Sequence, residues 1–96
     1  MAVWLITRHS GTVEWCAQQG LSIDQQVAHL QPEKVFAGDV IIGTLPIHLI
    51  ADITQKGARY LHLSLDLPEQ WRGQELTPSM LDAAGARLEE YSAHKL

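Results

Sequence analysis

The hydrophobic positions of this chain fall into short unbroken runs that alternate with segments of helical spacing. Val3–Thr7 and Asp39–Gly43 are predicted as strands, because each contains an unbroken apolar run. The Val-Ile-Ile run in the second indicates burial on both faces, as in a parallel sheet. Thr12–Gln19 and Pro46–Lys56 follow them with the spacing of helices that bury one face. The pattern therefore predicts two successive strand–helix units.

The remaining hydrophobic segments predict two more strands and one more helix. Gln26–Leu30 is predicted as a strand, and Arg59–Leu65 alternates between apolar and polar positions as a strand does. Pro68–Leu76 is predicted as a loop, and Thr77-Pro78 then carries the N-cap and first-turn signals of a third helix. The apolar face of that helix is expected to comprise Leu81, Ala84, Leu88 and Tyr91.

This order of elements predicts an α/β domain spanning residues 1–96, with a mostly parallel sheet of about four strands and flanking helices. If the strand order is 2-1-3-4, the connections that leave strands one and three diverge. A crevice then opens at the carboxyl ends of these two strands, where ligands bind in open α/β sheets. The loops Thr7–Gly11 and Gly43–Pro46 would form its walls.

Composition narrows the classes of ligand. The 96 residues carry a formal charge of −4, which argues against a basic face for long DNA or RNA. A small anion remains possible, because one or two cations and backbone N–H groups suffice to bind it. Cys16 is the only cysteine, and there is neither a basic leader nor an apolar run of membrane-spanning length. We therefore expect a cytoplasmic protein without a membrane partner.

The first candidate wall of the crevice combines a cation, an imidazole and two hydroxyls. Arg8 offers a fixed positive fork for a phosphate, while Gly11 lets the backbone approach a ligand closely. His9 can donate a hydrogen bond or act as acid or base, and Thr7 and Ser10 add hydroxyl groups. A histidine phosphatase is disfavoured, because Ser10 replaces the glycine of an Arg-His-Gly motif. The alternative is structural: Arg8 pairs with a carboxylate and His9 caps the loop.

The second candidate wall consists of Gly43, Thr44, Leu45 and Pro46, with Thr44 as the expected N-cap of the second helix. His48 falls in the first turn of this helix, where a carboxylate four residues later can orient its ring. The alternative interpretations are structural: Thr44 only caps the helix, and His48 is an ordinary surface histidine.

Three further regions carry candidate residues for the site. Asp66 ends the fourth strand, where a turn residue is as reasonable as a base. Arg72 could reach over a ligand and Trp71 could stack on a base, although solvation and core packing are the more common roles. His29 and His62 fall within predicted strands and are expected to be structural. No motif for a metal or a dinucleotide cofactor is present, so none is expected.

Three motifs together resemble a small CRISPR-associated accessory family of type III systems. They are Thr7-Arg8-His9-Ser10-Gly11-Thr12-Val13-Glu14-Trp15, Gly38-Asp39-Val40-Ile41-Ile42-Gly43-Thr44-Leu45-Pro46 and Arg72-Gly73-Gln74-Glu75-Leu76-Thr77. The resemblance spans residues 3–91. The family pattern has proline and alanine where this chain has Ser10 and Thr12.

The resemblance implies a Rossmann-like fold and a homodimeric, metal-independent ring nuclease. Such proteins cut cyclic oligoadenylate, typically cyclic tetra-adenylate, and switch off the immune signal. On this interpretation the candidate catalytic residues are Arg8, His9 and Ser10, and the candidate ligand-binding residues are Thr7, Gly11, Gly43, Thr44, Leu45, Pro46, His48, Asp66 and Arg72. The alternatives are a non-catalytic cyclic-nucleotide sponge or sensor, a phosphatase or another small-nucleotide hydrolase, and a structural partner protein.

Overall fold

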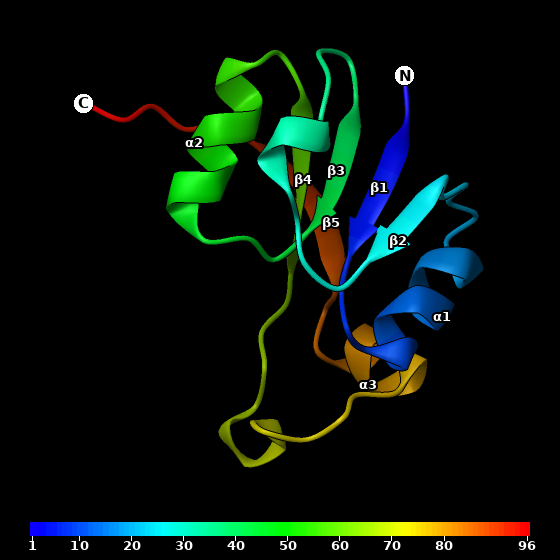
Figure 1. Cartoon of the computed structure of the whole chain (residues 1–96). Coiled ribbons are helices and arrows are strands. Elements are labelled where there is room, and N and C mark those ends of the chain that lie inside the picture. Colours follow the sequence, from blue (N-terminus) through cyan, green and yellow to red (C-terminus); the bar gives the residue numbers. More distant parts are fainter.

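The computed structural model describes residues 1–96 and contains one five-stranded sheet (Figure 1). Its order is β2-β1-β3-β4-β5. The first four strands in the chain run parallel, and β5 is antiparallel to β4. The strands span Val3–Ile6 (β1), Gln25–Val27 (β2), Val40–Gly43 (β3), Arg59–Ser64 (β4) and Arg87–Tyr91 (β5). The predicted α/β class, Rossmann-like sheet and 2-1-3-4 order of the parallel strands are confirmed.

Helices cover both faces of this sheet. α1 (Ser10–Gln18) connects β1 to β2, and α2 (Ile47–Gln55) connects β3 to β4. Because the two connections leave the central β1–β3 pair in opposite directions, right-handed crossovers place α1 and α2 on opposite faces. The short α3 (Pro78–Ala83) joins α1 on its face, as Figure 1 shows.

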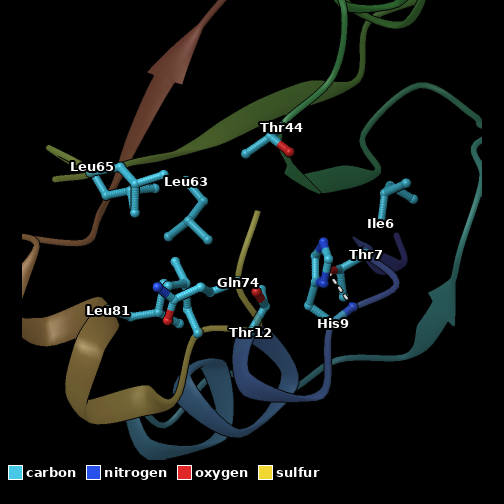
Figure 2. A pocket seen from close by; sticks show the side chains of 11 residues that line it. Ile6, Thr7, His9, Thr12, Thr44, Leu63, Leu65, Gln74 and Leu81 are labelled. Carbon is cyan, nitrogen blue, oxygen red and sulfur yellow. Dashed lines mark hydrogen bonds between the residues drawn. The ribbon is translucent and has the colours of Figure 1, made fainter. Parts of the chain in front are cut away.

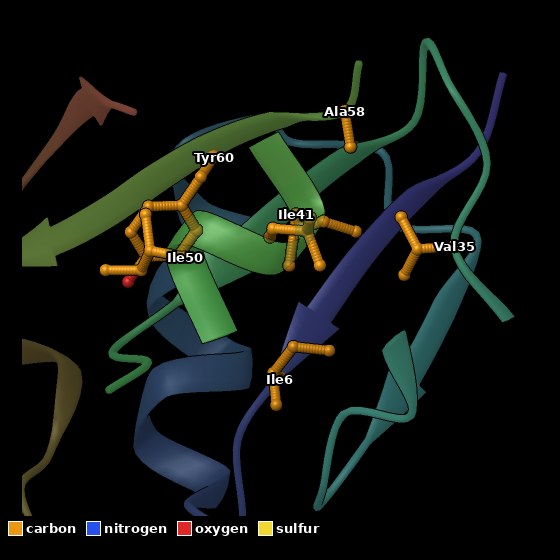
Figure 3. Close-up of a cluster of buried hydrophobic side chains, with 7 residues drawn as sticks. Ile6, Val35, Ile41, Ile50, Ala58 and Tyr60 are labelled. Atoms are coloured by element: carbon orange, nitrogen blue, oxygen red, sulfur yellow. The ribbon is translucent and has the colours of Figure 1, made fainter. Parts of the chain in front are cut away.

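Each face of the sheet buries its own hydrophobic cluster. On the α2 face, Ile41, Ile53 and Tyr60 are fully buried, and this cluster is shown in Figure 3. On the α1 and α3 face, the cluster comprises Leu5, Trp15, Cys16, Ile42, Leu63 and Leu81. Consecutive residues of β3 therefore serve opposite clusters, which explains why its sequence is apolar without alternation. Burial raises the pKa of the Cys16 thiol, in keeping with a packing role.

A buried carboxylate fastens the amino-terminal edge of the sheet. Asp39, 4% exposed, accepts hydrogen bonds from the backbone N–H of Ala2 at 2.9 Å and of Phe36 at 3.0 Å. It also accepts one from Trp4 Nε1 at 3.3 Å. The Phe36 and Ala2 amides lower the pKa of Asp39, since they favour the charged carboxylate.

The predicted third helix is wrong beyond its first turns. The chain leaves α3 through Gly85, whose φ of +73° is unfavourable for a side chain, and returns as β5. Leu88 and Tyr91 therefore lie on a strand paired with β4, although their spacing after Leu81 imitates a helix. The second strand is also shorter than predicted and ends at Val27. None of the helices is long and apolar enough to cross a membrane.

Candidate functional site

The candidate site begins where the two central strands end together. In the β1–β3 pair, Ile6 lies opposite Gly43, so the loops that start at Thr7 and Thr44 leave the sheet side by side. Gly43 allows this approach, because a Cβ there would lie 2.9 Å from the Ile6 carbonyl oxygen. The carboxyl edge of the sheet thus brings both predicted walls to one place, at the point where the chain connections diverge.

Two adjoining cavities lie at this edge. Both are lined by Ile6, Thr7, His9 and Thr44, so these four residues stand between them. One cavity lies toward α1 and α3, because Leu63 and Leu81 belong to the cluster on that face. The other lies toward α2, from which Leu49 reaches it. We call them the leucine cavity and the polar cavity.

The polar cavity, of about 350 Å³, gathers the cation and imidazoles of the site. Arg8 and His9 come from the loop after β1, and His29 comes from the loop after β2. Leu45 and Pro46 close it from the loop after β3. Arg8 forms no ion pair or hydrogen bond with another side chain, so its guanidinium is available to an anionic ligand.

The leucine cavity, of about 310 Å³, is apolar over most of its wall. Figure 2 shows Leu63, Leu65 and Leu81 on one side, facing His9 and Thr7 on the other. Thr12 and Gln74 add the polar groups that belong to this cavity alone. Its volume falls at the lower end of the ~300–1,000 Å³ typical of small-molecule sites.

A carboxylate holds the ring of His9. Nδ1 of His9 lies 3.1 Å from both carboxylate oxygens of Glu75, and both side chains are more than half exposed. Since a carboxylate only accepts, Nδ1 donates, and neutral His9 keeps its lone pair on Nε2. The backbone N–H of His9 donates to Thr7 Oγ1 at 3.1 Å, which steadies the loop. This tautomer is the one that can accept a proton through Nε2.

The hydroxyl group of Tyr60 holds the second wall. It donates to the Gly43 carbonyl oxygen at 3.0 Å and accepts from the Leu45 backbone N–H at 2.9 Å. Nδ1 of His62 lies 2.6 Å from the same oxygen and must donate, because the one hydroxyl proton is already used. Burial raises the pKa of Tyr60, so this proton stays in place at neutral pH. His62 is therefore structural, as predicted.

The start of α1 is packed against the segment that precedes α3. A Cβ on Gly11 would lie 1.8 Å from the Leu76 carbonyl oxygen, so only glycine fits here. The close approach predicted for Gly11 is thus made to the protein's own backbone. His9 occupies the N-cap position of α1 and makes no side-chain cap, which leaves the first amides of the helix without one.

Of the predicted site residues, six line the cavities, whereas Ser10, Gly11, Gly43, His48, Asp66 and Arg72 line neither. Thr7, Arg8, His9, Thr44, Leu45 and Pro46 line one or both. Ser10 is exposed and lines neither.

His48 lies outside the predicted crevice, in a hollow with Asp52 on the outer side of α2. A carboxylate oxygen of Asp66 lies 3.7 Å from the Arg87 guanidinium. Arg72 is exposed and Trp71 is half-buried, and neither residue lines a cavity. Thr44 is not a helix cap, since Pro46 occupies the N-cap position of α2.

Sequence reasoning missed four polar residues of the site. His29 was placed inside a strand, but it follows the end of β2 and lines the polar cavity. Thr12, Gln74 and Glu75 lie in the motifs of the resemblance, yet no local pattern indicates that they face the loop after β1. No group of three or more histidine, cysteine, aspartate or glutamate side chains is arranged to hold a metal ion.

A comparison with protein families identifies a family for this chain. The family model described as "Putative CRISPR-associated protein (Cas_VVA1548)" matches residues 4–94. No curated protein and no solved structure matches the chain. Because the family match covers nearly all of its length, the protein belongs to this CRISPR-associated family.

Proposed function

We propose that the protein is a metal-independent ring nuclease of type III CRISPR systems, which binds cyclic oligoadenylate and cuts it to linear products. The observation that carries this proposal is the polar cavity, where Arg8, His9 and His29 converge with the Thr44 loop. A phosphodiester needs such a cation and such hydrogen-bond donors. Membership in a CRISPR-associated family supplies the biological setting. The expected ligand is cyclic tetra-adenylate.

The proposed reaction uses a nucleophile from the ligand itself. A ribose 2′-hydroxyl attacks the adjacent phosphorus and forms the new P–O2′ bond, while the P–O5′ bond breaks. The 2′-hydroxyl proton passes to a base, and the departing 5′-oxygen takes a proton from an acid. The products are a 2′,3′-cyclic phosphate and a 5′-hydroxyl on a linear chain.

The residues of the polar cavity suit the parts of this reaction. Nε2 of His9, held as an acceptor by Glu75, is the proposed base for the 2′-hydroxyl. Arg8 and the amides at the start of α1 stabilise negative charge on the phosphate oxygens. His29 supplies a second imidazole beside the same cavity and is the proposed acid. Holding the hydroxyl in line with the leaving oxygen adds a contribution from positioning alone.

A homodimer is part of the proposal. A ring of four identical nucleotides is compatible with two-fold symmetry, and a C2 dimer presents the same loop twice. Each protomer would then contribute one Arg8–His9 loop to one ring.

The test is incubation of the protein with labelled cyclic tetra-adenylate in the presence of EDTA. Resolution of the products by chromatography and mass spectrometry should show linear adenylates ending in 2′,3′-cyclic phosphate. The assignment of the polar cavity would be contradicted if the protein did not cleave the ring and if both Arg8→Ala and His29→Ala still bound it as tightly as the unmodified chain.

The second candidate is a non-catalytic sponge or sensor of the same ligand. It is favoured by the exposure of His9, because 58% of its side chain is accessible, whereas an active site that excludes water would bury its acid–base group. Tight binding of the intact ring, without product after prolonged incubation, would select this alternative.

A further inference from the structure

We propose that the leucine cavity is an adenine-binding subsite in which Gln74 reads the base. The inference rests on the proposed function for the identity of the ligand, but it concerns a separate part of the site. Gln74 and the leucines that line this cavity are not among the site residues predicted from the sequence.

The lining of the cavity suits a flat aromatic base. Its walls are formed mainly by leucines from β4, from the loop after β4 and from α3, which are Leu63, Leu65, Leu67, Leu76 and Leu81. Aliphatic side chains bury the faces of a base taken out of a stack, as other apolar side chains do in enzymes that bind such bases. Neither a lysine nor an arginine lines the cavity, so a phosphate finds no ionic partner within it.

The amide of Gln74 provides the pair of groups that adenine requires. Nε2 of Gln74 uses one of its two protons to donate to the Gln70 carbonyl oxygen at 2.8 Å. One N–H and the Oε1 acceptor remain. A glutamine amide pairs in this way with N7 and the 6-amino group of adenine. The hydroxyl of Thr12 supplies a second polar contact on the same wall.

The position of the cavity places the base beside the proposed phosphate site. Thr7, His9 and Thr44 line both cavities, so a nucleotide can lie across them with its ribose at this boundary. The base then enters toward α3 and the phosphate toward Arg8. This arrangement brings the ribose hydroxyls close to His9, the residue proposed to accept their proton.

The experiment uses adenosine 5′-monophosphate and its 7-deaza analogue, which lacks the N7 acceptor. Methyl NMR spectra of leucine-labelled full-length protein are recorded during titration with each nucleotide to millimolar concentration. Adenosine monophosphate should shift the methyl signals of the five lining leucines through its ring current. Leu21 and Leu61, which line neither cavity, serve as internal controls.

The role of Gln74 is tested by crossing the ligand change with a side-chain change. The unmodified chain should bind adenosine monophosphate about tenfold more tightly than the 7-deaza analogue, within the discrimination of a bidentate amide–adenine pair. Gln74→Leu should bind both equally weakly. Gln70→Leu, whose backbone carbonyl still accepts from Gln74, is the matched control and should retain the preference. Both positions are exposed, so the substitutions are compatible with folding.

Each result separates the subsite from the proposed reaction. Absence of leucine shifts, or an unchanged preference in Gln74→Leu, overturns the adenine subsite, even if cyclic tetra-adenylate is cleaved. Leucine shifts and an N7-dependent preference support the subsite, even if the ring is neither bound nor cut, in which case the ring nuclease proposal fails alone.

Discussion

At the amino-terminal edge of the sheet, the Asp39 carboxylate is buried and accepts three hydrogen bonds from the chain. At the carboxyl edge, Arg8 is exposed without an ionic partner, and His9 keeps one ring nitrogen free. Polar groups at the first edge are used up within the protein, so they stabilise it. Those at the second edge are exposed and keep groups that the protein does not use, so they remain available to a ligand. Substitutions at the two edges should therefore separate stability from activity.

The largest expected effect is at the carboxyl edge. His9→Ala removes the proposed base and should lower the cleavage rate of cyclic tetra-adenylate by about 10²–10⁴-fold. The free energy of unfolding should change by less than ~0.5 kcal/mol, because the side chain is exposed. Single-turnover experiments measure the cleavage rate, and calorimetry measures the affinity for cyclic tetra-adenylate. His48→Ala, on the outer side of α2, is the matched control, and equal rates for the two variants would remove His9 from the mechanism.

The opposite pattern is expected for Asp39→Asn at the amino-terminal edge. An amide cannot accept all three hydrogen bonds, so the free energy of unfolding should fall by about 2–3 kcal/mol. Cleavage per folded molecule should be unchanged. Urea denaturation measures the stability, with Asp24→Asn as control, since the exposed Asp24 accepts only from Val3 N at 2.8 Å. Equal losses in the two variants would contradict the importance of burial.

The pH dependence sharpens the same comparison. The pKa of Asp39 is lowered in the folded chain from an ordinary value of 3.8, mainly by the Phe36 and Ala2 amides. Its stabilising contribution is therefore complete above pH 3.8 and is lost as the pH falls through the lower folded value. The stability gap between the unmodified chain and Asp39→Asn should narrow below pH 3.8 in denaturation curves. If this difference in unfolding free energy instead widened as the pH fell, the pKa of Asp39 could not be lowered in the folded chain.

A smaller effect on both properties is expected for Tyr60→Phe, which links the core to the second wall of the site. Loss of the hydroxyl leaves Gly43 O and Leu45 N without this partner and should cost about 1–2 kcal/mol of unfolding free energy. Ring binding should weaken as the Thr44 loop loosens. Tyr91→Phe, at a half-exposed position, is the control in both measurements. Unchanged binding would show that Tyr60 serves stability alone.

The smallest effect is expected for Glu75→Gln. The amide oxygen still accepts from His9, but the charge is lost, and exposed ion pairs are worth about 0–1 kcal/mol. Cleavage should therefore slow by at most about fivefold. Glu69→Gln in the same loop provides the control for single-turnover rates. A loss as large as that of His9→Ala would instead assign a direct chemical role to Glu75.

Local pattern predicted the parts of the fold that depend on neighbouring residues. The apolar runs of β1 and β3 and the helices that follow them are encoded within each segment. The convergence of the loops at Thr7 and Thr44 followed from the assumed strand order, which places β1 beside β3. β5 was missed because Leu88 and Tyr91 continue the helical spacing of Leu81. The pairing with β4 and the turn at Gly85 decide its structure, and neither is visible in that spacing.

The site was predictable only on the loop that carries its own chemistry. Arg8 and His9 follow a buried strand directly, which marks them as candidates. Glu75 reaches His9 across 66 positions of sequence, so its role depends on the loop after β4 folding back. His29 lies just past a strand of only three residues, and an error in the end of that strand conceals it.

The close contact between Gly11 and the Leu76 carbonyl oxygen joins the lining of the leucine cavity to the start of α1. Leu76 lines the leucine cavity, while Gly11 sits in the first turn of α1, directly after the loop that carries Arg8 and His9. With no side chain between them, neither segment can move toward the other without displacing it. A ligand that presses the Leu76 segment toward α1 should therefore also displace the turn that follows Arg8 and His9.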